Sequence, residues 1–187
     1  MVQTPSRILT LGEFLHMPET KPASEYVDGQ IIQKPMPKGK HSVIQTELAS
    51  TINAVLKLKR TARAFSELRC TFGSRSTVPD VSVFISKRIP RDENGEIANV
   101  FPIAPDWTIE ILSPEQSHTK VTKNILHCLK HGTHMGWLID PAEQTVFVYL
   151  PKQETEVFDE SEQLLPVPSF AHELRLSVGE LFGWLME

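Results

Sequence analysis

The sequence predicts an α/β domain, in the broad α+β sense, in which one mixed β-sheet is flanked by helices. Short apolar segments typical of strands alternate with two longer segments whose apolar residues recur at helical spacing. The length of 187 residues fits a single domain over residues 1–187, with its core over about residues 41–150. The clearest strand-like segments are Val78–Ser86, Trp107–Leu112, Gly136–Asp140 and Thr145–Leu150.

The N-terminal part predicts a short helix followed by a β-hairpin. Thr10 is followed three residues later by Glu13, which is the spacing of a capping box, so we expect a helix over residues 10–17. Asp28-Gly29 lies between apolar residues, and this dipeptide favours a two-residue hairpin turn. The hairpin would form an N-terminal extension of the sheet domain.

Two longer helices are expected to cover the sheet. The first, over about residues 42–58, begins at a second capping-box pattern formed by Ser42 and Gln45. The second, over about residues 117–131, is followed by Gly132, a residue type typical of the position after a helix. Its predicted inner face consists of Val121, Ile125, Cys128 and Leu129.

The remaining segments predict shorter elements. Residues 65–70 have the composition of a strand, and residues 87–105 contain the Pro, Asp, Asn and Gly residues of a surface loop. Ser177 and Glu180 again have capping-box spacing, which predicts a final short helix.

Charge is unevenly distributed along the chain. The net charge of −4 argues against binding of nucleic acid by bulk electrostatics. Between Lys34 and Arg75, however, nine Lys and Arg residues stand against two acids, whereas acids dominate from Lys152 to the end. The basic region predicts either a surface that faces a polyanion or an ordinary solvated helix end.

Several features favour a cytoplasmic protein that does not enter a membrane. No apolar segment approaches the length of a membrane span, and the first residues lack the pattern of a secretory signal. Cys70 and Cys128 have neither metal-site nor disulfide spacing and are expected to be reduced thiols. His127, His131 and His134 lie near one helix end, where a surface position is favoured over a zinc site.

Two acidic residues, Asp80 and Glu110, each lie within an otherwise apolar, strand-like segment. A buried carboxylate is costly unless it is paired or bound to a metal. If the two strands are neighbours, these carboxylates meet and suit Mg²⁺ or Mn²⁺. The alternative is that both are acids at strand ends that only favour solubility.

Four motifs, in this order, resemble a known group of nucleases. The acidic motifs are similar to those of the PD-(D/E)XK nuclease superfamily, which has the restriction-endonuclease-like fold. The whole set resembles more narrowly the putative restriction endonuclease family that is numerous in photosynthetic bacteria, and the likeness covers about residues 10–185. The motifs are Tyr26-Val-Asp-Gly29, Pro79-Asp80, Glu110-Ile-Leu-Ser-Pro114 and Gly136-Trp-Leu-Ile-Asp-Pro141.

The resemblance implies that Asp80 and Glu110 bind the catalytic metal. The superfamily lysine normally follows two residues after the second acid, where this chain has Leu112. In the resembling family a lysine on the next helix replaces it, and an ungapped alignment puts Asn124 at that position. Lys120 lies one helical turn before Asn124 and projects on the same face, so we expect Lys120 to act as the lysine. A solvated helix lysine is the alternative.

Two further acids are candidates for a supporting catalytic role. Members of the superfamily often place a glutamate from the first core helix near the metal, and Glu47 lies midway along that predicted helix. Glu67 belongs to the strand-like segment over residues 65–70. Either acid could equally be solvated.

These inferences predict a Mg²⁺- or Mn²⁺-dependent DNA endonuclease that hydrolyses phosphodiester bonds. Many members of this fold act as dimers because cleavage of two strands needs two sites, so we expect a homodimer that binds DNA. The departures at Leu112 and Asn124 leave a second hypothesis. In this second hypothesis the protein keeps the fold but is a non-catalytic DNA-binding or protein-interaction module.

Overall fold

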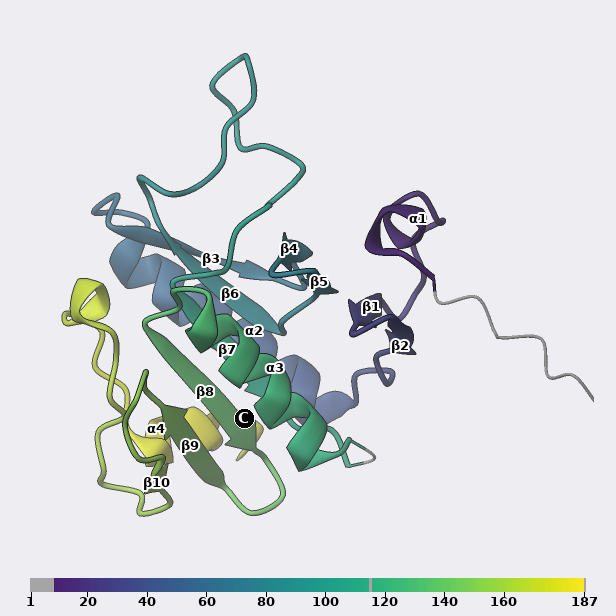
Figure 1. Ribbon diagram of the computed structural model, residues 1–187. Helices are drawn as coiled ribbons and strands as arrows, with labels where there is room; N and C mark the ends of the chain where they lie inside the picture. Colours follow the sequence, from purple (N-terminus) through teal and green to yellow (C-terminus); the bar gives the residue numbers. More distant parts are fainter. Residues whose placement is uncertain (1–8, 115, 187) are drawn as a thin grey trace, which may run out of the picture.

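The computed structural model describes residues 9–186 with the exception of residue 115. A six-stranded mixed sheet has the strand order β10-β9-β8-β7-β6-β3, and a four-stranded sheet has the order β2-β1-β5-β4 (Figure 1). The predicted mixed sheet is thus confirmed, but the N-terminal hairpin belongs to a second sheet. The larger sheet comprises β3 (Ala62–Ser66), β6 (Val81–Ile85), β7 (Trp107–Ile111), β8 (Met135–Asp140), β9 (Thr145–Tyr149) and β10 (Glu156–Phe158). The smaller sheet comprises β1 (Ser24–Val27), β2 (Gln30–Gln33), β4 (Cys70–Phe72) and β5 (Arg75–Thr77).

Helices cover both faces of the larger sheet. Strand β7 is buried on both faces, as expected for a strand in the middle of a sandwiched sheet. Its residues Trp107 and Ile109 face α2 and α4, whereas on the other side of the sheet Leu138 of β8 packs with Val121 of α3. The helices are α1 (Leu11–Leu15), α2 (Gly39–Leu56), α3 (His118–Lys130) and α4 (Val178–Gly183), with a 3-10 turn before α4 at Ser169–Ala171 and another after it at Trp184–Met186.

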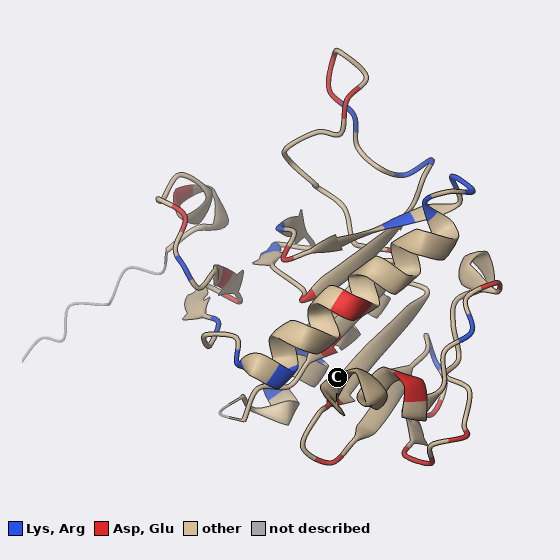
Figure 2. Cartoon of the chain, turned by 180° about the vertical axis from the view of Figure 1, so that it is seen from behind, with Lys and Arg blue, Asp and Glu red and all other residues tan. Residues whose placement is uncertain are grey.

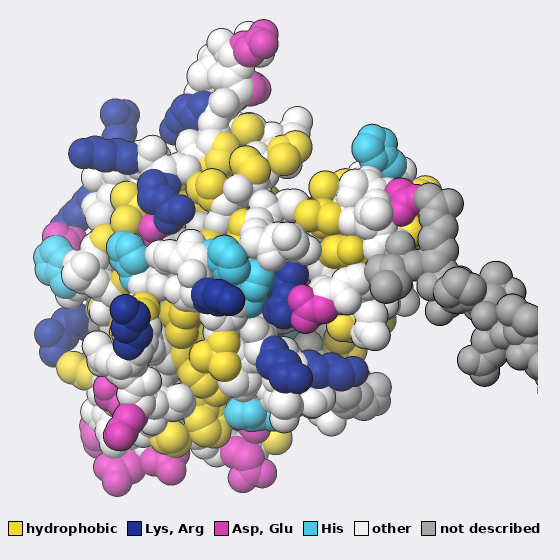
Figure 3. Space-filling model, in the orientation of Figure 1, with side chains coloured by type: hydrophobic (Ala, Val, Ile, Leu, Met, Phe, Trp, Pro, Cys, Tyr) yellow, Lys and Arg dark blue, Asp and Glu magenta, His cyan; other side chains and the backbone are white. Residues whose placement is uncertain are grey.

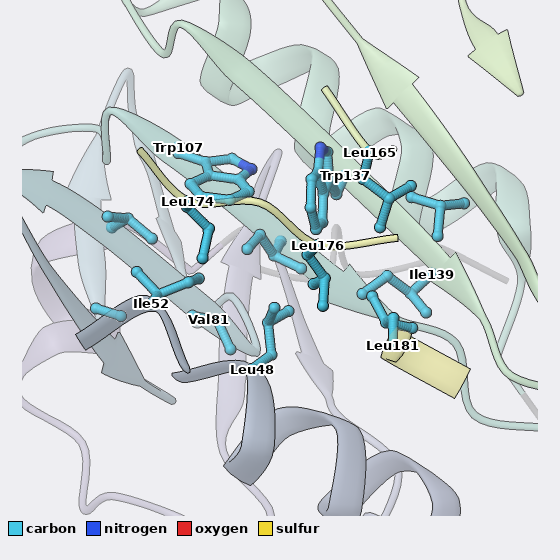
Figure 4. Packing of buried hydrophobic residues seen from close by; sticks show 14 of the residues in the cluster. Leu48, Ile52, Val81, Trp107, Trp137, Ile139, Leu165, Leu174, Leu176 and Leu181 are labelled. Carbon is cyan, nitrogen blue, oxygen red and sulfur yellow. The ribbon is translucent and has the colours of Figure 1, made fainter. Parts of the chain in front are cut away.

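The main core lies between the larger sheet, α2 and the C-terminal segment. Figure 4 shows Leu48 and Ile52 of α2 pointing towards Trp107 and Trp137 of the sheet. The two indole rings meet edge to face with their centroids 4.7 Å apart. Because β6 and β7 are antiparallel, the start of β6 and the end of β7 lie side by side.

The hairpin is formed as the sequence predicts. Asp28 and Gly29 have φ values of 50° and 84°, the left-handed conformations that a type I′ turn requires. Tyr26 of β1 pairs with Ser76 of β5, which joins the hairpin to the rest of the chain. Arg75 donates to both carboxylate oxygens of Asp28 and so fastens the turn to β5.

Most predicted element boundaries are close to those observed. The capping boxes at Thr10 and Ser177 are both present. The predicted capping box at Ser42 is wrong, because α2 begins three residues earlier and Ser42 lies inside it. The predicted strand over residues 65–70 is also wrong, because the chain is split between β3 and β4 by Glu67, whose φ is 49°.

Within the part of the chain that the structure describes, no helix combines the length and apolar character needed to cross a bilayer.

Candidate active site

The register of β6 and β7 brings Asp80 and Glu110 together. These strands are antiparallel, and Val81 is paired with Ile109. Continuing the register by one residue places Asp80, which precedes β6, beside Glu110. The Ile111 N–H donates to Asp80 Oδ2 at 2.7 Å, which fixes the Asp80 carboxylate against β7. Both acids are almost completely buried.

A lysine that the sequence analysis did not single out lies between these two acids. Lys34 directly follows β2, and its Nζ donates to Asp80 Oδ1 at 2.6 Å and to the Val78 carbonyl at 2.7 Å. The same Nζ lies 3.6 Å from Glu110 Oε2. The smaller sheet therefore supplies the cation, and the larger sheet supplies both carboxylates.

Helix α2 adds two polar side chains from its first turns. His41 lies with Nε2 3.1 Å from Asp80 Oδ2 and donates to it, and its Nδ1 has no hydrogen-bond partner among the described residues. Gln45 donates from Nε2 to the Asp80 carbonyl at 2.9 Å. The Asp80 carboxylate is consequently held from three sides by Lys34, His41 and the backbone of Ile111.

A third buried carboxylate, Glu25 of β1, stands next to this group. Its Oε1 accepts from the Val78 N–H at 2.8 Å, and its Oε2 accepts from Asn124 Nδ2 at 3.2 Å. Asn124 occupies the position at which the resembling family carries a lysine, and here it binds an acid from the hairpin. Glu25 and Asn124 thus connect the smaller sheet, the larger sheet and α3 at one point.

Burial and charge set the protonation of the cluster. Burial disfavours the Lys34 ammonium, but the carboxylates of Asp80, Glu110 and Glu25 outweigh it and raise the Lys34 pKa. Burial also opposes the charge of Asp80, but Lys34 and then His41 hold the pKa of Asp80 well below its usual range. Burial raises the pKa of Glu110 well above its usual value. The nearby carboxylates of Asp80 and Glu25 also raise it, whereas the Lys34 ammonium lowers it. Burial and charge therefore favour a charged Lys34–Asp80 pair and disfavour the ionised form of Glu110.

The atoms around the Lys34 ammonium indicate whether this position also suits a divalent cation. Two carboxylates and the Val78 carbonyl surround this position, which is an all-oxygen donor set around a positive charge. Among the described residues no group of three or more His, Cys, Asp and Glu side chains is placed to hold a metal. Mg²⁺ typically uses only one or two carboxylates and completes its shell with water and phosphate oxygens. The donor set fits Mg²⁺ or Mn²⁺ if the ammonium moves aside.

A groove of about 580 Å³ leads to this cluster between the hairpin and α3. Glu25, Lys34 and Asn124 line its floor, and Lys120 and Lys123 of α3 line its rim together with Arg75. Figure 3 shows Lys and Arg side chains gathered between α3 and the hairpin, on the face where this groove opens. An anionic chain that entered the groove would meet Lys120, Lys123 and the Arg75–Asp28 pair before the buried acids.

The structure places the predicted site residues in different surroundings. Asp80 and Glu110 meet, and Lys34 lies between them. Lys120 is exposed at the rim of the groove, and no ion pair joins it to either acid within the described residues. Glu67 is exposed and lines a small cavity with Lys34, His41 and Asp80. Glu47 is exposed on α2 and lines neither of these hollows.

Sequence reasoning missed Lys34, His41, Gln45 and Glu25. Glu25 carried a usable signal, because it is an acid directly before Tyr26 in the apolar hairpin motif. Lys34 carried a weaker signal, since it ends a strand just before Pro35 and was counted only as part of a basic region. Nothing in the local pattern marked His41 or Gln45 as facing a site, because their contacts with Asp80 depend on how α2 packs against the larger sheet.

Comparisons with known proteins show which proteins this chain is similar to. No curated protein matches the chain. A crystal structure of a putative nuclease from Anabaena variabilis ATCC 29413 is 75% identical in sequence, covers 95% of this chain and 99% of its own, and superposes with a TM-score of 0.94. The sequence model of the putative restriction endonuclease family matches residues 11–179. The chain belongs to the putative restriction endonuclease family.

Proposed function

We propose that this protein is an endonuclease that hydrolyses phosphodiester bonds of DNA with the help of Mg²⁺ or Mn²⁺. The observation that carries the proposal is the buried pair of acids, Asp80 and Glu110, around a single cationic position at the end of a basic groove. Membership of a family described as putative restriction endonucleases and the likeness to a putative nuclease support it.

Asp80 and Glu110 would hold the divalent cation, which, when bound, supplies Lewis-acid polarisation of the phosphoryl group and lowers the pKa of a water molecule. Glu110 would lose its proton when it becomes a ligand. The Ile111 N–H and His41 keep the Asp80 carboxylate in one orientation before and after that change.

Lys34 is proposed as the catalytic lysine in place of one at position 112 or 124. Its ammonium would give up its bond to Asp80 and donate to the attacking water or to a phosphate oxygen, where negative charge develops in the transition state. The distance it has to move is small, because its Nζ already lies between both acids. Lys120, at the rim, is proposed to contact the DNA backbone.

Cleavage of supercoiled plasmid with Mg²⁺ or Mn²⁺ tests the assignment. Asp80→Asn and Glu110→Gln should each lower the cleavage rate by about 100-fold or more, because each removes a charged ligand. Glu47→Gln is the matched control, since it removes the same charge from an exposed position on α2. If both site variants retain full metal-dependent cleavage, the proposed site is wrong.

Comparison of Lys34→Gln with Lys120→Gln identifies the catalytic lysine. Lys34→Gln should abolish cleavage, whereas Lys120→Gln should weaken DNA binding and leave the rate at saturating DNA nearly unchanged. The reverse pattern would assign the catalytic role to Lys120 and leave Lys34 as a structural cation.

The closed Lys34–Asp80 pair also supports a second candidate function, in which the acids only stabilise the fold and the protein is a non-catalytic DNA-binding or protein-interaction module. Wild-type protein that binds DNA but cleaves none with either metal would favour it. A homodimer remains our expectation for the nuclease, because two cuts need two sites, and light scattering after gel filtration would measure the mass.

A further inference from the structure

A second basic hollow lies at the opposite end of α2 from His41. It has a volume of about 270 Å³ and lies where α2 ends, β3 begins and the loop after β6 turns back. Among the residues that the structure describes, no acidic one lines it. Figure 2 shows Lys and Arg residues grouped at this end of α2 and on β3, while the acids of the nearby loop lie towards its tip. The charged residues that line the hollow are Lys57, Arg60, Arg63 and Arg91.

Within the described structure, acids do not neutralise the cations of this hollow, although two neighbouring basic residues are paired with acids. Lys59 is paired with Glu173, and Arg88 is paired with Asp106. In contrast, the side chains of Lys57 and Arg60 make neither a hydrogen bond nor an ion pair within the described part of the chain. Like charges lining one concave surface raise its positive potential, so the hollow favours an anion.

The other two cations are partly held in place by neighbours. The Arg63 guanidinium lies over the Phe65 ring, 5.4 Å from its centre. Arg91 donates from Nη1 to the Gly95 carbonyl at 2.8 Å, which leaves its other donors for a ligand. Fixed guanidinium groups of this kind suit the several oxygens of a phosphate.

The position of the hollow relates it to the candidate active site. Strand β3 is the edge strand of the larger sheet, with Arg63 near its start and Glu67, which lines the cavity beside Asp80, just after its end. The four-residue step from Arg63 to Glu67 spans about 13 Å of strand, and the sixteen-residue step from His41 to Lys57, just after α2, spans about 24 Å. One strand of a duplex carries a phosphate about every 3.4 Å, so the two sites are roughly four to seven phosphates apart.

We propose that this hollow binds backbone phosphates of a DNA duplex several nucleotides away from the bond that is cleaved. The identity of the ligand rests on the proposed nuclease function, whereas the hollow itself does not. DNA is favoured over a small phosphorylated molecule because the hollow is open and offers four cations, while Ser86 is the single uncharged polar residue that the structure describes in its lining.

The test measures binding of a fluorescently labelled 24-base-pair duplex by anisotropy, without divalent metal, at several potassium chloride concentrations. Each phosphate contact contributes about 0.9 to the slope of log affinity against log salt, so Lys57→Gln/Arg60→Gln should reduce the slope by about 1.8. Lys130→Gln/Lys152→Gln removes the same charge from exposed positions outside the hollow and should change the slope by much less. Lys57→Arg/Arg60→Lys keeps the charge and should bind like wild type, which shows that the charge and not the particular side chain is required; far-UV circular dichroism and thermal unfolding check that Lys57→Gln/Arg60→Gln is folded.

Plasmid cleavage by the same variants separates the two proposals. An unchanged salt slope in Lys57→Gln/Arg60→Gln, with cleavage intact in the wild type, overturns the phosphate site alone. Equal slope losses in that variant and in Lys130→Gln/Lys152→Gln also overturn it, because a non-specific charge effect would then explain the binding. A wild type that neither binds the duplex nor cleaves plasmid overturns both proposals.

Discussion

Lys34 Nζ and Asp80 Oδ1 lie 2.6 Å apart, although 46 residues separate them in the sequence. The lysine directly follows β2 of the smaller sheet, and the aspartate directly precedes β6 of the larger one. Both side chains are nearly buried, with exposed fractions of 11% and 1%. The contact therefore joins the two sheets and also closes the candidate metal position.

Replacement of Lys34 by methionine should strongly destabilise the protein. The Asp80 carboxylate would remain buried with one cation fewer, and loss of one partner of a buried pair costs about 3–5 kcal/mol. Urea unfolding at pH 7 measures the change in the free energy of unfolding. Lys120→Met is the matched control, since Lys120 is exposed, and it should shift that free energy by only about 0.5 kcal/mol. Similar losses in both variants would show that the Lys34–Asp80 contact does not hold the sheets together.

Replacement of Glu110 by glutamine should stabilise the metal-free protein at neutral pH. Burial raises the pKa of Glu110 well above 4.5, so the folded state binds a proton that the unfolded state has lost. The stabilising effect of that proton is complete below about pH 4.5 and disappears as the pH rises through the folded-state pKa. Glutamine needs no proton, so the stability of Glu110→Gln should fall less with rising pH.

Urea unfolding in the presence of a chelator at pH 5 and pH 8 measures this difference. The gap between Glu110→Gln and the wild type should be larger at pH 8, and Glu154→Gln, at an exposed position, should show no such gap. The charge of Asp80 affects stability in a different pH range. Because its pKa is lowered in the folded state, its stabilising effect disappears only as the pH falls below about 4. A gap that is equal at both pH values would contradict the raised pKa of Glu110.

Two substitutions of Glu25 should differ in their cost. Glu25→Ala leaves the buried Val78 N–H without its acceptor, which costs about 1–3 kcal/mol. Glu25→Gln keeps an oxygen for that N–H, so it should cost less, although it removes a charge near Lys34. Thermal unfolding of both variants checks the order. Equal losses would mean that the charge of Glu25, and not its hydrogen bond, supports the hairpin.

The sequence predicted the elements of the fold well because their signals are local. The Asp28-Gly29 turn needs only two residues that tolerate positive φ, and the capping box at Thr10 needs two residues three positions apart. The inner face of α3 could also be predicted, since Val121, Ile125 and Cys128 recur at helical spacing and are all buried. At Ser42 the local signal was misleading, because a capping-box pattern that lies inside α2 gave a helix start three residues too late.

The candidate site could be predicted only in part, because its members come from different elements. The two acids stood out as charges in apolar strands, and their meeting required only that β6 and β7 be neighbours. Lys34 could not be identified this way, because its contact depends on how the smaller sheet packs against the larger one. The predicted surface position of His127 is wrong for the same reason. The β4–β5 hairpin covers this residue, and its ring stacks on Phe72 with the centroids 5.0 Å apart.

The same hairpin gives a prediction about Gly73. This residue has a φ of +54°, and a Cβ added to it would lie 2.3 Å from His131 Nε2 and 2.8 Å from His127 Cε1. Neither ring can move freely, because His127 Nε2 lies 3.3 Å from the Phe72 carbonyl, to which it donates, and His131 Nδ1 lies 2.8 Å from the His127 carbonyl. Gly73→Ala should therefore cost about 2 kcal/mol or more, from backbone strain and from displacement of the rings.

Gly95→Ala is the matched control for Gly73→Ala. Gly95 has a φ of +79°, but no atom lies within 4 Å of its added Cβ, so only the backbone strain of about 1 kcal/mol remains. Combining Gly73→Ala with His131→Ala should remove most of the steric part, so the double variant should lose less stability than the sum of the two single variants. Chemical unfolding of all four variants measures this coupling, and strictly additive losses would show that the histidines do not press against the turn at Gly73.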